Sequence, residues 1–171
     1  MVPLELDVEL ESLSDIDPHT GLDQLLDQHL RRLLHDLALF IPYDAAAAWL
    51  GTDDRPSLRV VLPADATLPP LAGARHTIFQ ATAEAARIAD FRTTYGVDDS
   101  ELRCWLGVPL VLHGRRRGWV EVWNTQPNRF SDVDLERAAI IVRHAAFGLT
   151  QLEATIQVQR HSLMQQALLP S

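Results

Sequence analysis

Apolar residues recur at helical spacing in two long segments, one near each end of the chain. The first segment holds seven leucines: Leu22, Leu25, Leu26, Leu30, Leu33, Leu34 and Leu37. Residues three, four and seven positions apart share one side of an α-helix, so this pattern predicts an amphipathic helix. Thr20 and Asp23 are placed to cap its start. Pro42 is expected to stop it, because proline removes a backbone donor and clashes with the preceding turn.

A second helix is predicted to begin after Ser131. Pro127 and Asn128 interrupt the apolar run before it, and Ser131 stands three residues before Asp134. A serine followed three residues later by an acidic residue is typical of a helix N-cap with an acidic third position. The apolar-periodic stretch that follows at once predicts a long helix.

Two apolar runs in the second half of the chain predict a β-hairpin. Residues 105–112 and 119–123 are rich in β-branched and aromatic side chains, so we expect them to pair antiparallel. Gly114 and Gly118 bracket three arginines, Arg115 to Arg117, where a short connection needs permissive backbone angles. These arginines are expected at a solvated hairpin tip, where they are available to an acidic partner surface.

The first half predicts a similar hairpin, formed by residues 45–50 and 58–62 around a turn. The turn residues are Gly51, Asp53, Asp54, Arg55 and Pro56. Further on we expect a loop at 63–73, a short helix at 78–86, a short strand at 86–89 and a polar crossover at 91–103. Two amphipathic helices that bracket four or five strands predict an α+β layer, with both helices on one side of an antiparallel sheet.

Composition narrows the class of protein. A chain of 171 residues that is 47% hydrophobic is long enough for one globular domain with helical extensions. Its net charge of −8 disfavours nucleic acid as a partner, since binding to a phosphate backbone is driven by Lys and Arg. No apolar run approaches the ~18 to 20 residues of a membrane span, and residues 1–11 are acidic where a secretory signal is basic. We therefore expect a cytoplasmic protein without a membrane partner.

No constellation for catalysis or metal binding is found in the sequence. The seven histidines show no spacing that places two metal ligands on one helical face. The single cysteine, Cys104, excludes an intramolecular disulfide framework and is expected to be a small buried residue at the start of a strand. The sequence therefore predicts that this chain is not an enzyme, and it identifies no cofactor.

The second hairpin and the helix start together resemble a known family. The segment 104–136 reads CWLGVPLVLHGRRRGWVEVWNTQPNRFSDVDLE, and its LGVPL strand, basic hairpin, second strand and F-x-x-x-D-L-E helix start resemble the end of a GAF domain, a small-molecule sensory module of bacterial signalling proteins. The resemblance covers about residues 22–152 and is weaker between 63 and 87. It implies an antiparallel sheet with the terminal helices on one face and a ligand pocket on the other, roofed by residues 71–103. GAF-type methionine sulfoxide reductases work with several cysteines, and this chain has one.

A candidate ligand pocket follows from the aromatic residues. Trp119, Glu121 and Trp123 alternate onto one face of their strand, so a carboxylate is expected between two indoles. If this face lines the pocket, Glu121 accepts hydrogen bonds from a cationic or amide-bearing ligand while the rings supply apolar area or cation–π contacts. The alternative is that the face lies under the terminal helices, with Glu121 at the sheet margin paired to an arginine. The other candidate ligand-binding residues are Phe79, Phe91, Tyr95 and Trp105.

The end of the chain extends beyond the domain core. Leu149, Leu152, Ile156 and Leu163 continue the helical stripe, with Gln159 and Gln166 at alternating positions, and such a helix is able to pair with a second copy. Residues 164–170, MQQALLP, resemble the L-Q-x-x-L-L-P junction that links sensory domains to bacterial serine/threonine phosphatase domains of the sporulation and stress-response type. The alternative for these residues is an ordinary helix end.

The organisation predicted from the sequence has three parts. Residues 1–20 form a leader, 21–152 a GAF-like sensory domain, and 153–171 a C-terminal signalling helix. The predicted function is a non-catalytic regulatory domain, dimeric through its terminal helices, that binds a small molecule or partner and acts on an output domain. Two alternatives stay open: a ligand-free dimerisation scaffold filled by its own tryptophans, and a redox or light sensor that carries haem or another non-covalent cofactor.

Overall fold

The computed structural model describes residues 18–52, 55–68, 84–95 and 101–169. Five strands in this part of the chain form one antiparallel sheet of order β2-β1-β5-β4-β3. The strands are β1 (Ala45–Thr52), β2 (Arg55–Leu62), β3 (Ala86–Ile88), β4 (Cys104–Leu112) and β5 (Arg115–Asn124). The helices are α2 (Pro18–Phe40), α4 (Phe91–Tyr95) and α5 (Asp132–Ala167).

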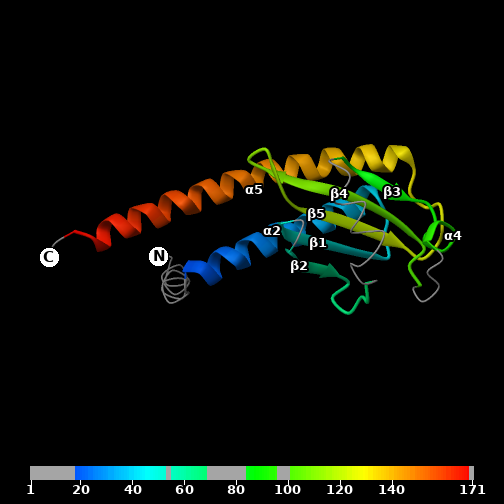
Figure 1. The fold of residues 1–171 in the computed structure, drawn as a ribbon, viewed down its shortest axis with the longest axis horizontal. Helices are drawn as coiled ribbons and strands as arrows, with labels where there is room; N and C mark the ends of the chain where they lie inside the picture. Colours follow the sequence, from blue (N-terminus) through cyan, green and yellow to red (C-terminus); the bar gives the residue numbers. More distant parts are fainter. Residues whose placement is uncertain (1–17, 53–54, 69–83, 96–100, 170–171) are drawn as a thin grey trace, which may run out of the picture.

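The two long helices pack against each other and against the same face of the sheet (Figure 1). In one hydrophobic core, five leucines of α2 and four residues of α5 meet alternate residues of β1, β4 and β5: Leu26, Leu30, Leu33, Leu34 and Leu37 of α2, and Ala138, Val142, Ala146 and Leu149 of α5. Of the other two leucines predicted for the apolar side of α2, Leu25 is exposed, and the side chain of Leu22 lies outside the described part. This confirms the predicted α+β fold with both terminal helices on one side of an antiparallel sheet.

The start of α5 is confirmed as predicted. The Ser131 side chain accepts a hydrogen bond from the Asp134 amide at 3.2 Å, and the Ser131 amide donates to Asp134 Oδ2 at 2.9 Å. These reciprocal bonds form a capping box. The predicted start of α2 was wrong: the helix begins at Pro18, so Thr20 lies inside it. Proline is well suited to the first helical turn, because its missing N–H has no helical partner there.

The hairpin turns are tighter than predicted. In the β1–β2 hairpin the ladder continues to the pairs Gly51–Pro56 and Thr52–Arg55. Pro56 is tolerated because β2 lies at the sheet edge, and proline in a strand is confined largely to such edges. Gly51 has φ +128°, and a Cβ there would lie 2.3 Å from the Arg55 carbonyl oxygen.

In the second hairpin the turn residues are His113 and Gly114, with φ 51° and 70°. Positive angles at both central residues are those of a type I′ turn. The assignment of Gly118 and the arginines to the connection was therefore wrong, because all of them lie in β5. Gly118 instead stands where a Cβ would approach the Trp49 carbonyl oxygen to 1.8 Å.

The middle of the chain is described in part. The short strand predicted at 86–89 is confirmed as β3, and the predicted crossover at 91–103 contains the short helix α4. Of the helix predicted at 78–86, residues 78–83 lie outside the described part, and residues 84–86 are not helical.

Helix α5 has two halves with different surroundings. Its first half covers the sheet as far as Leu149, whereas nearly all residues beyond Glu153 are exposed. The exposed half continues past the sheet, and the N-terminal end of α2 lies on the same side (Figure 1). No helix in the described part of the chain is long and apolar enough to cross a membrane.

Candidate functional site

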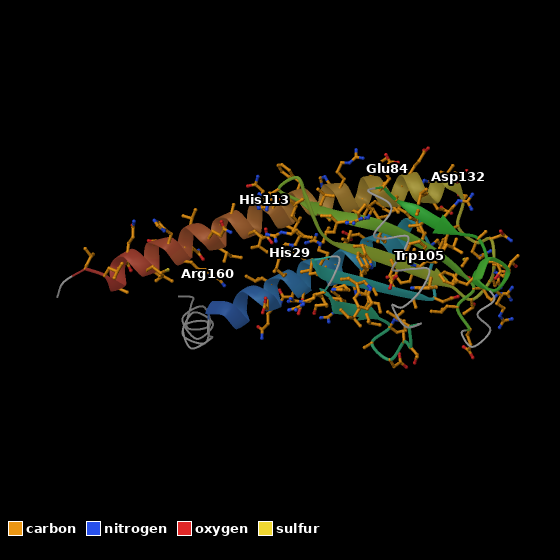
Figure 2. All side chains as sticks on the ribbon, in the orientation of Figure 1. His29, Glu84, Trp105, His113, Asp132 and Arg160 are labelled. Atoms are coloured by element: carbon orange, nitrogen blue, oxygen red, sulfur yellow. The ribbon has the colours of Figure 1, made fainter. Side chains whose placement is uncertain are left out.

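All four tryptophans of the sequence gather on the sheet face opposite the two long helices. We call Trp49, Trp105, Trp119 and Trp123 the tryptophan cluster. Trp105, Trp119 and Trp123 are buried together with Ala45, Ile88 and Leu102, and Trp49 packs against them in a partly buried position. Figure 2 shows Trp105 within the side chains on this side of the sheet.

Strand register brings the four rings together in pairs. Trp119 of β5 lies opposite Trp49 of β1, and Trp123 lies opposite Trp105 of β4. The ring centroids are 6.3 Å apart in each pair, with interplanar angles of 38° and 59°. Tilted aromatic pairs at this separation contribute about 0.5–1.5 kcal/mol each beyond their buried area. The register therefore accounts for a cluster built from three strands.

Glu121 lies at the centre of this cluster and is fully buried. The Trp49 indole N–H donates to Oε1 and the Trp105 indole N–H donates to Oε2, each at 2.9 Å. Both cross-strand neighbours of Glu121 are small, Ala47 on β1 and Gly107 on β4, and they leave room for the carboxylate between the rings. The two donors offset part of the cost of removing a carboxylate from water, and they fix its orientation.

The alternative placement of Glu121 under the terminal helices is wrong. Residues on either side of it, Val120 and Val122, belong to the helix-covered core, and Glu121 points to the opposite face. It also lies in the middle strand of the sheet, since β5 pairs with both β1 and β4.

A short helix covers one side of the tryptophan cluster. Phe91, the first residue of α4, lies 5.0 Å from Trp123 between ring centroids. Asp90 caps this helix by accepting hydrogen bonds from the Arg92 amide at 3.1 Å and the Thr93 hydroxyl at 3.0 Å. Arg103 donates to both oxygens of Asp90, at 2.9 and 2.6 Å.

These contacts have an electrostatic consequence. The hydrogen bond from Arg103, with the smaller contributions of Thr93 and the Arg92 amide, lowers the pKa of Asp90 to about 2. Asp90 and Arg103 therefore form a charged clasp that fixes α4 to the residue just before β4. We call this pair the α4 clasp.

The structure brings together five of the seven ligand-binding residues predicted from the sequence: Phe91, Trp105, Trp119, Glu121 and Trp123. Tyr95 ends α4, and Phe79 lies outside the described residues. Trp49 was missed, although it is one of the two indole donors to Glu121. The only sequence signal for it was a tryptophan in a predicted strand, because the strand order that places β1 beside β5 cannot be read from local pattern.

The described side chains of this face are suited to binding a ligand. Cys104 is buried in the helix-covered core, and burial raises the pKa of its thiol, so the reactive thiolate is disfavoured. No group of three or more His, Cys, Asp or Glu side chains suited to a metal ion occurs among the described residues. A carboxylate framed by aromatic rings is instead suited to cations and to N–H donors.

Sequence comparison finds no matching protein family and no matching curated protein. Solved structures do match. The GAF3 domain from Synechocystis sp. PCC6803 in its photoproduct state is 14% identical, with a TM-score of 0.62, covering 80% of this chain and 99% of that one. The GAF domain of a sensor histidine kinase from Bacillus halodurans is 17% identical, with a TM-score of 0.58, covering 76% and 97%.

The type II free methionine-R-sulfoxide reductase from Thermoplasma acidophilum also matches, at 14% identity and a TM-score of 0.60, covering 73% of this chain and 92% of that one. Proteins with different activities thus share this arrangement of sheet and helices, and at these identities the similarity concerns the fold alone. The chain has the fold of the solved GAF domains.

Proposed function

We propose that this chain is a sensory domain that binds a small molecule on the tryptophan face of its sheet and passes the signal along α5 to an output domain. The observation that carries the proposal is the buried carboxylate of Glu121, held by two indole N–H groups in the central strand. Hydrophobic packing alone does not require a carboxylate there, and burying one is costly. Two domains that share this fold support a sensory role: the GAF domain of a sensor histidine kinase and the GAF3 domain solved in its photoproduct state.

The ligand expected on this face carries a positive charge or amide N–H groups. Glu121 supplies the acceptor, and the rings of the tryptophan cluster supply apolar and cation–π contacts. Phe91 and α4 line the same face, and the α4 clasp holds them in place.

The route to the output starts on the strand that carries Glu121. The β4–β5 turn consists of His113 and Gly114, and Figure 2 labels His113 where this turn lies beside α5. His113 Nε2 is 3.3 Å from Glu153 Oε2 on that helix. Glu153 stands one turn beyond Leu149, the last buried residue of α5, so the contact lies where the helix leaves the sheet. A ligand that binds more tightly to one position of β5 would shift the equilibrium between two positions of α5. The size of that shift is set by the difference in the ligand's affinity for the two states.

The output domain proposed is a serine/threonine phosphatase, because residues 164–170 resemble the junction that precedes such domains. The chain would act as a homodimer through its terminal helices. The coding sequence after Ser171 tests the first part directly: metal-binding aspartates of a phosphatase domain are expected there, and a stop codon or an unrelated domain would exclude this output.

Ligand binding is tested by native mass spectrometry of the freshly purified chain, followed by thermal-shift titration. The probes are tetramethylammonium for the cation and N-methylacetamide for the amide. We expect a co-purified mass, or a rise in Tm with one probe, which Glu121→Gln abolishes and the exposed control Glu136→Gln retains. A bare protein whose Tm responds to neither probe would contradict the sensory proposal.

One observation favours a second function, that of a ligand-free dimerisation scaffold. Trp105, Trp119 and Trp123 are at most 2% exposed and pack on their neighbours. If these rings fill the face completely, tryptophan fluorescence will stay unchanged throughout both titrations while the chain remains a dimer. A fluorescence change that saturates would instead exclude the scaffold.

A further inference from the structure

A groove of about 740 Å³ runs along one flank of α5, between this helix and β4. We call it the β4 groove. None of its lining residues belongs to the tryptophan cluster, so the proposed ligand does not occupy it. Two large apolar side chains that line it are exposed to solvent, Phe147 at 66% and Val111 at 43%. Scattered apolar residues are normal on a protein surface, but several around one groove are typical of an interaction site.

The β4 groove has the length and the floor that a docked helix requires. Four lining residues of α5 are spaced by four, three and four positions and so share one side of this helix: Leu135, Ala139, Val142 and Ala146. The two alanines have short side chains, which let a second helix approach closely. From Leu135 to Thr150 the lining extends for about 22 Å, at about 1.5 Å per residue. An open groove of this length leaves a small molecule largely in water, whereas a helix of about four turns covers it.

An extended strand fits the same groove less well. In the described part of the chain, the residues of β4 beyond Gly107 pair on one side only, with β5. Pro109 lies in this stretch and also lines the groove. Proline has no N–H to donate, and it is one of the residues that protect sheet edges from further pairing. We therefore expect an occupant that packs side chains against α5 rather than one that extends the sheet.

The charges around the β4 groove indicate the polarity of its occupant. Glu84, Glu136 and Arg143 all line the groove and are exposed. Glu84 precedes β3 and lies beside the first half of α5 (Figure 2). Among the described residues, none of these three side chains makes an ion pair. The groove thus offers two carboxylates against one guanidinium, and a partner with basic side chains beside apolar ones is complementary to it.

We propose that the β4 groove binds an amphipathic helix of a partner protein, with large apolar side chains over the two alanines and basic side chains facing Glu84 and Glu136. Helices dock in this way when they lay an apolar stripe of three- and four-residue spacing into an apolar groove. The groove lies along the half of α5 that covers the sheet, so the partner contacts the helix to which the proposed function assigns the signal. The inference goes beyond that function and does not require a ligand on the tryptophan face.

The first experiment measures the binding of a model peptide to the full chain by fluorescence anisotropy. The probe, the lysine peptide, is a dye-labelled peptide of about 16 residues with leucine at three- and four-residue spacing and lysine beside this stripe. The control, the glutamate peptide, has glutamate in place of every lysine. We expect saturable binding of the lysine peptide, and binding of the glutamate peptide that is at least about 10-fold weaker. Equal binding of the two peptides, or binding of neither, would overturn the proposed partner chemistry.

Three variants locate the contact, and circular dichroism checks that each is folded. Phe147→Arg should weaken binding of the lysine peptide at least about 10-fold, because it places a charge where the apolar stripe packs. Ile140→Arg adds the same charge on α5, at a residue that is 62% exposed and does not line the groove, so the affinity should stay within about twofold. Equal losses from these two variants would overturn the site. Glu136→Lys should reverse the preference between the two peptides, and an unchanged preference would overturn the charge assignment.

Two further measurements distinguish other occupants of the groove. Far-UV circular dichroism should show a gain of helix when the lysine peptide binds, since a free helix of this length is marginal in water; a gain of strand would overturn the proposal. Sedimentation equilibrium is carried out without peptide. If Phe147→Arg dissociates a dimer that Ile140→Arg leaves intact, a second copy occupies the groove and the separate partner is excluded.

The docking site and the proposed ligand site are separated by one more variant. Glu121→Gln should leave the affinity for the lysine peptide unchanged, because Glu121 does not line the β4 groove. A loss of peptide binding in this folded variant would overturn the assignment of the peptide to the groove. Failure of ligand binding in the thermal-shift titration and failure of peptide binding are thus independent results.

Discussion

The two faces of the sheet share the same strands but are built from different chemistry. The face under α2 and α5 is packed with leucine, valine and alanine, and its stability follows from apolar area removed from water. The opposite face carries the tryptophan cluster around one buried carboxylate. Aliphatic packing specifies little beyond size and shape, whereas a buried carboxylate must find donors in fixed positions. The helix-covered face thus stabilises the fold, and the tryptophan face specifies the orientation of the buried Glu121 carboxylate.

The largest expected effect comes from Gly118→Ala, which would break both faces at once. A Cβ at this position would lie 1.8 Å from the Trp49 carbonyl oxygen and 2.9 Å from the Leu50 Cα. These are backbone atoms of the neighbouring strand, so relief requires β1 and β5 to separate. We expect a loss of about 4 kcal/mol or more in the free energy of unfolding, or failure to fold. Urea denaturation followed by far-UV circular dichroism measures it.

Gly148→Ala is the matched control, because it adds the same methyl group where nothing lies within 4 Å. Under conditions where the chain is monomeric, it should stabilise the fold by about 0.5–1 kcal/mol through helix propensity. Similar losses from both variants would show that the close approach of β1 and β5 is not what makes Gly118 necessary.

Gly118 also illustrates what the sequence does and does not predict. The helix-covered face was predictable, because the leucine spacing and the Ser131–Asp134 pair act within a few residues of each other. Gly118 was assigned to a turn, since a glycine beside an arginine run looks the same whether it serves a turn or a neighbouring backbone. Only the strand order β2-β1-β5-β4-β3 distinguishes the two, and that order depends on pairing between segments far apart in the chain.

The next effect, from Glu121→Gln, should be confined to the tryptophan face. The amide has one acceptor oxygen where the carboxylate has two, so one indole N–H would face an NH₂ group instead of an acceptor. A buried donor without an acceptor costs about 1–3 kcal/mol. We expect a loss of that size in urea denaturation and a change in the near-UV circular dichroism of the tryptophans.

The exposed substitution Glu136→Gln should stay within about 0.5 kcal/mol of the unmodified chain. If Glu121→Gln is equally neutral and leaves the near-UV spectrum unchanged, the hydrogen bonds from the Trp49 and Trp105 indoles to Glu121 do not stabilise the tryptophan face.

The centre of the candidate site was predictable only in part, for a physical reason. Alternation along one strand suffices to place Trp119, Glu121 and Trp123 on a common face. The two indole donors to Glu121 come from other strands, and Trp49 lies 72 residues away in the sequence. The small residues Ala47 and Gly107, which make room for the carboxylate, carry no local signal at all.

The smallest effect is expected from Asp90→Asn, which loosens the α4 clasp at the edge of the tryptophan face. Arg103 and the α4 donors stabilise the ionised carboxylate and lower its pKa to about 2, below the value of about 3.9 for an unfolded chain. The folded state therefore binds fewer protons than the unfolded state between these values, and the contribution of Asp90 to stability grows with pH. It is fully present above about pH 5 and is lost as the pH falls through 4 toward 2.

Thermal unfolding of the unmodified chain and Asp90→Asn, from pH 6 down to pH 2, checks this sign. The Tm difference between the two proteins should be constant above about pH 5 and should shrink steadily below it. When Asp90→Asn is made in a chain that already carries Arg103→Gln, the Tm difference should be smaller at pH 6 as well, because either substitution alone removes the Asp90–Arg103 pair. A Tm difference that is independent of pH would mean that Asp90 acts only as a neutral helix cap. In that case the charge of the α4 clasp would not distinguish the tryptophan face from the helix-covered one, and among the described charges the distinction would rest on the buried carboxylate of Glu121.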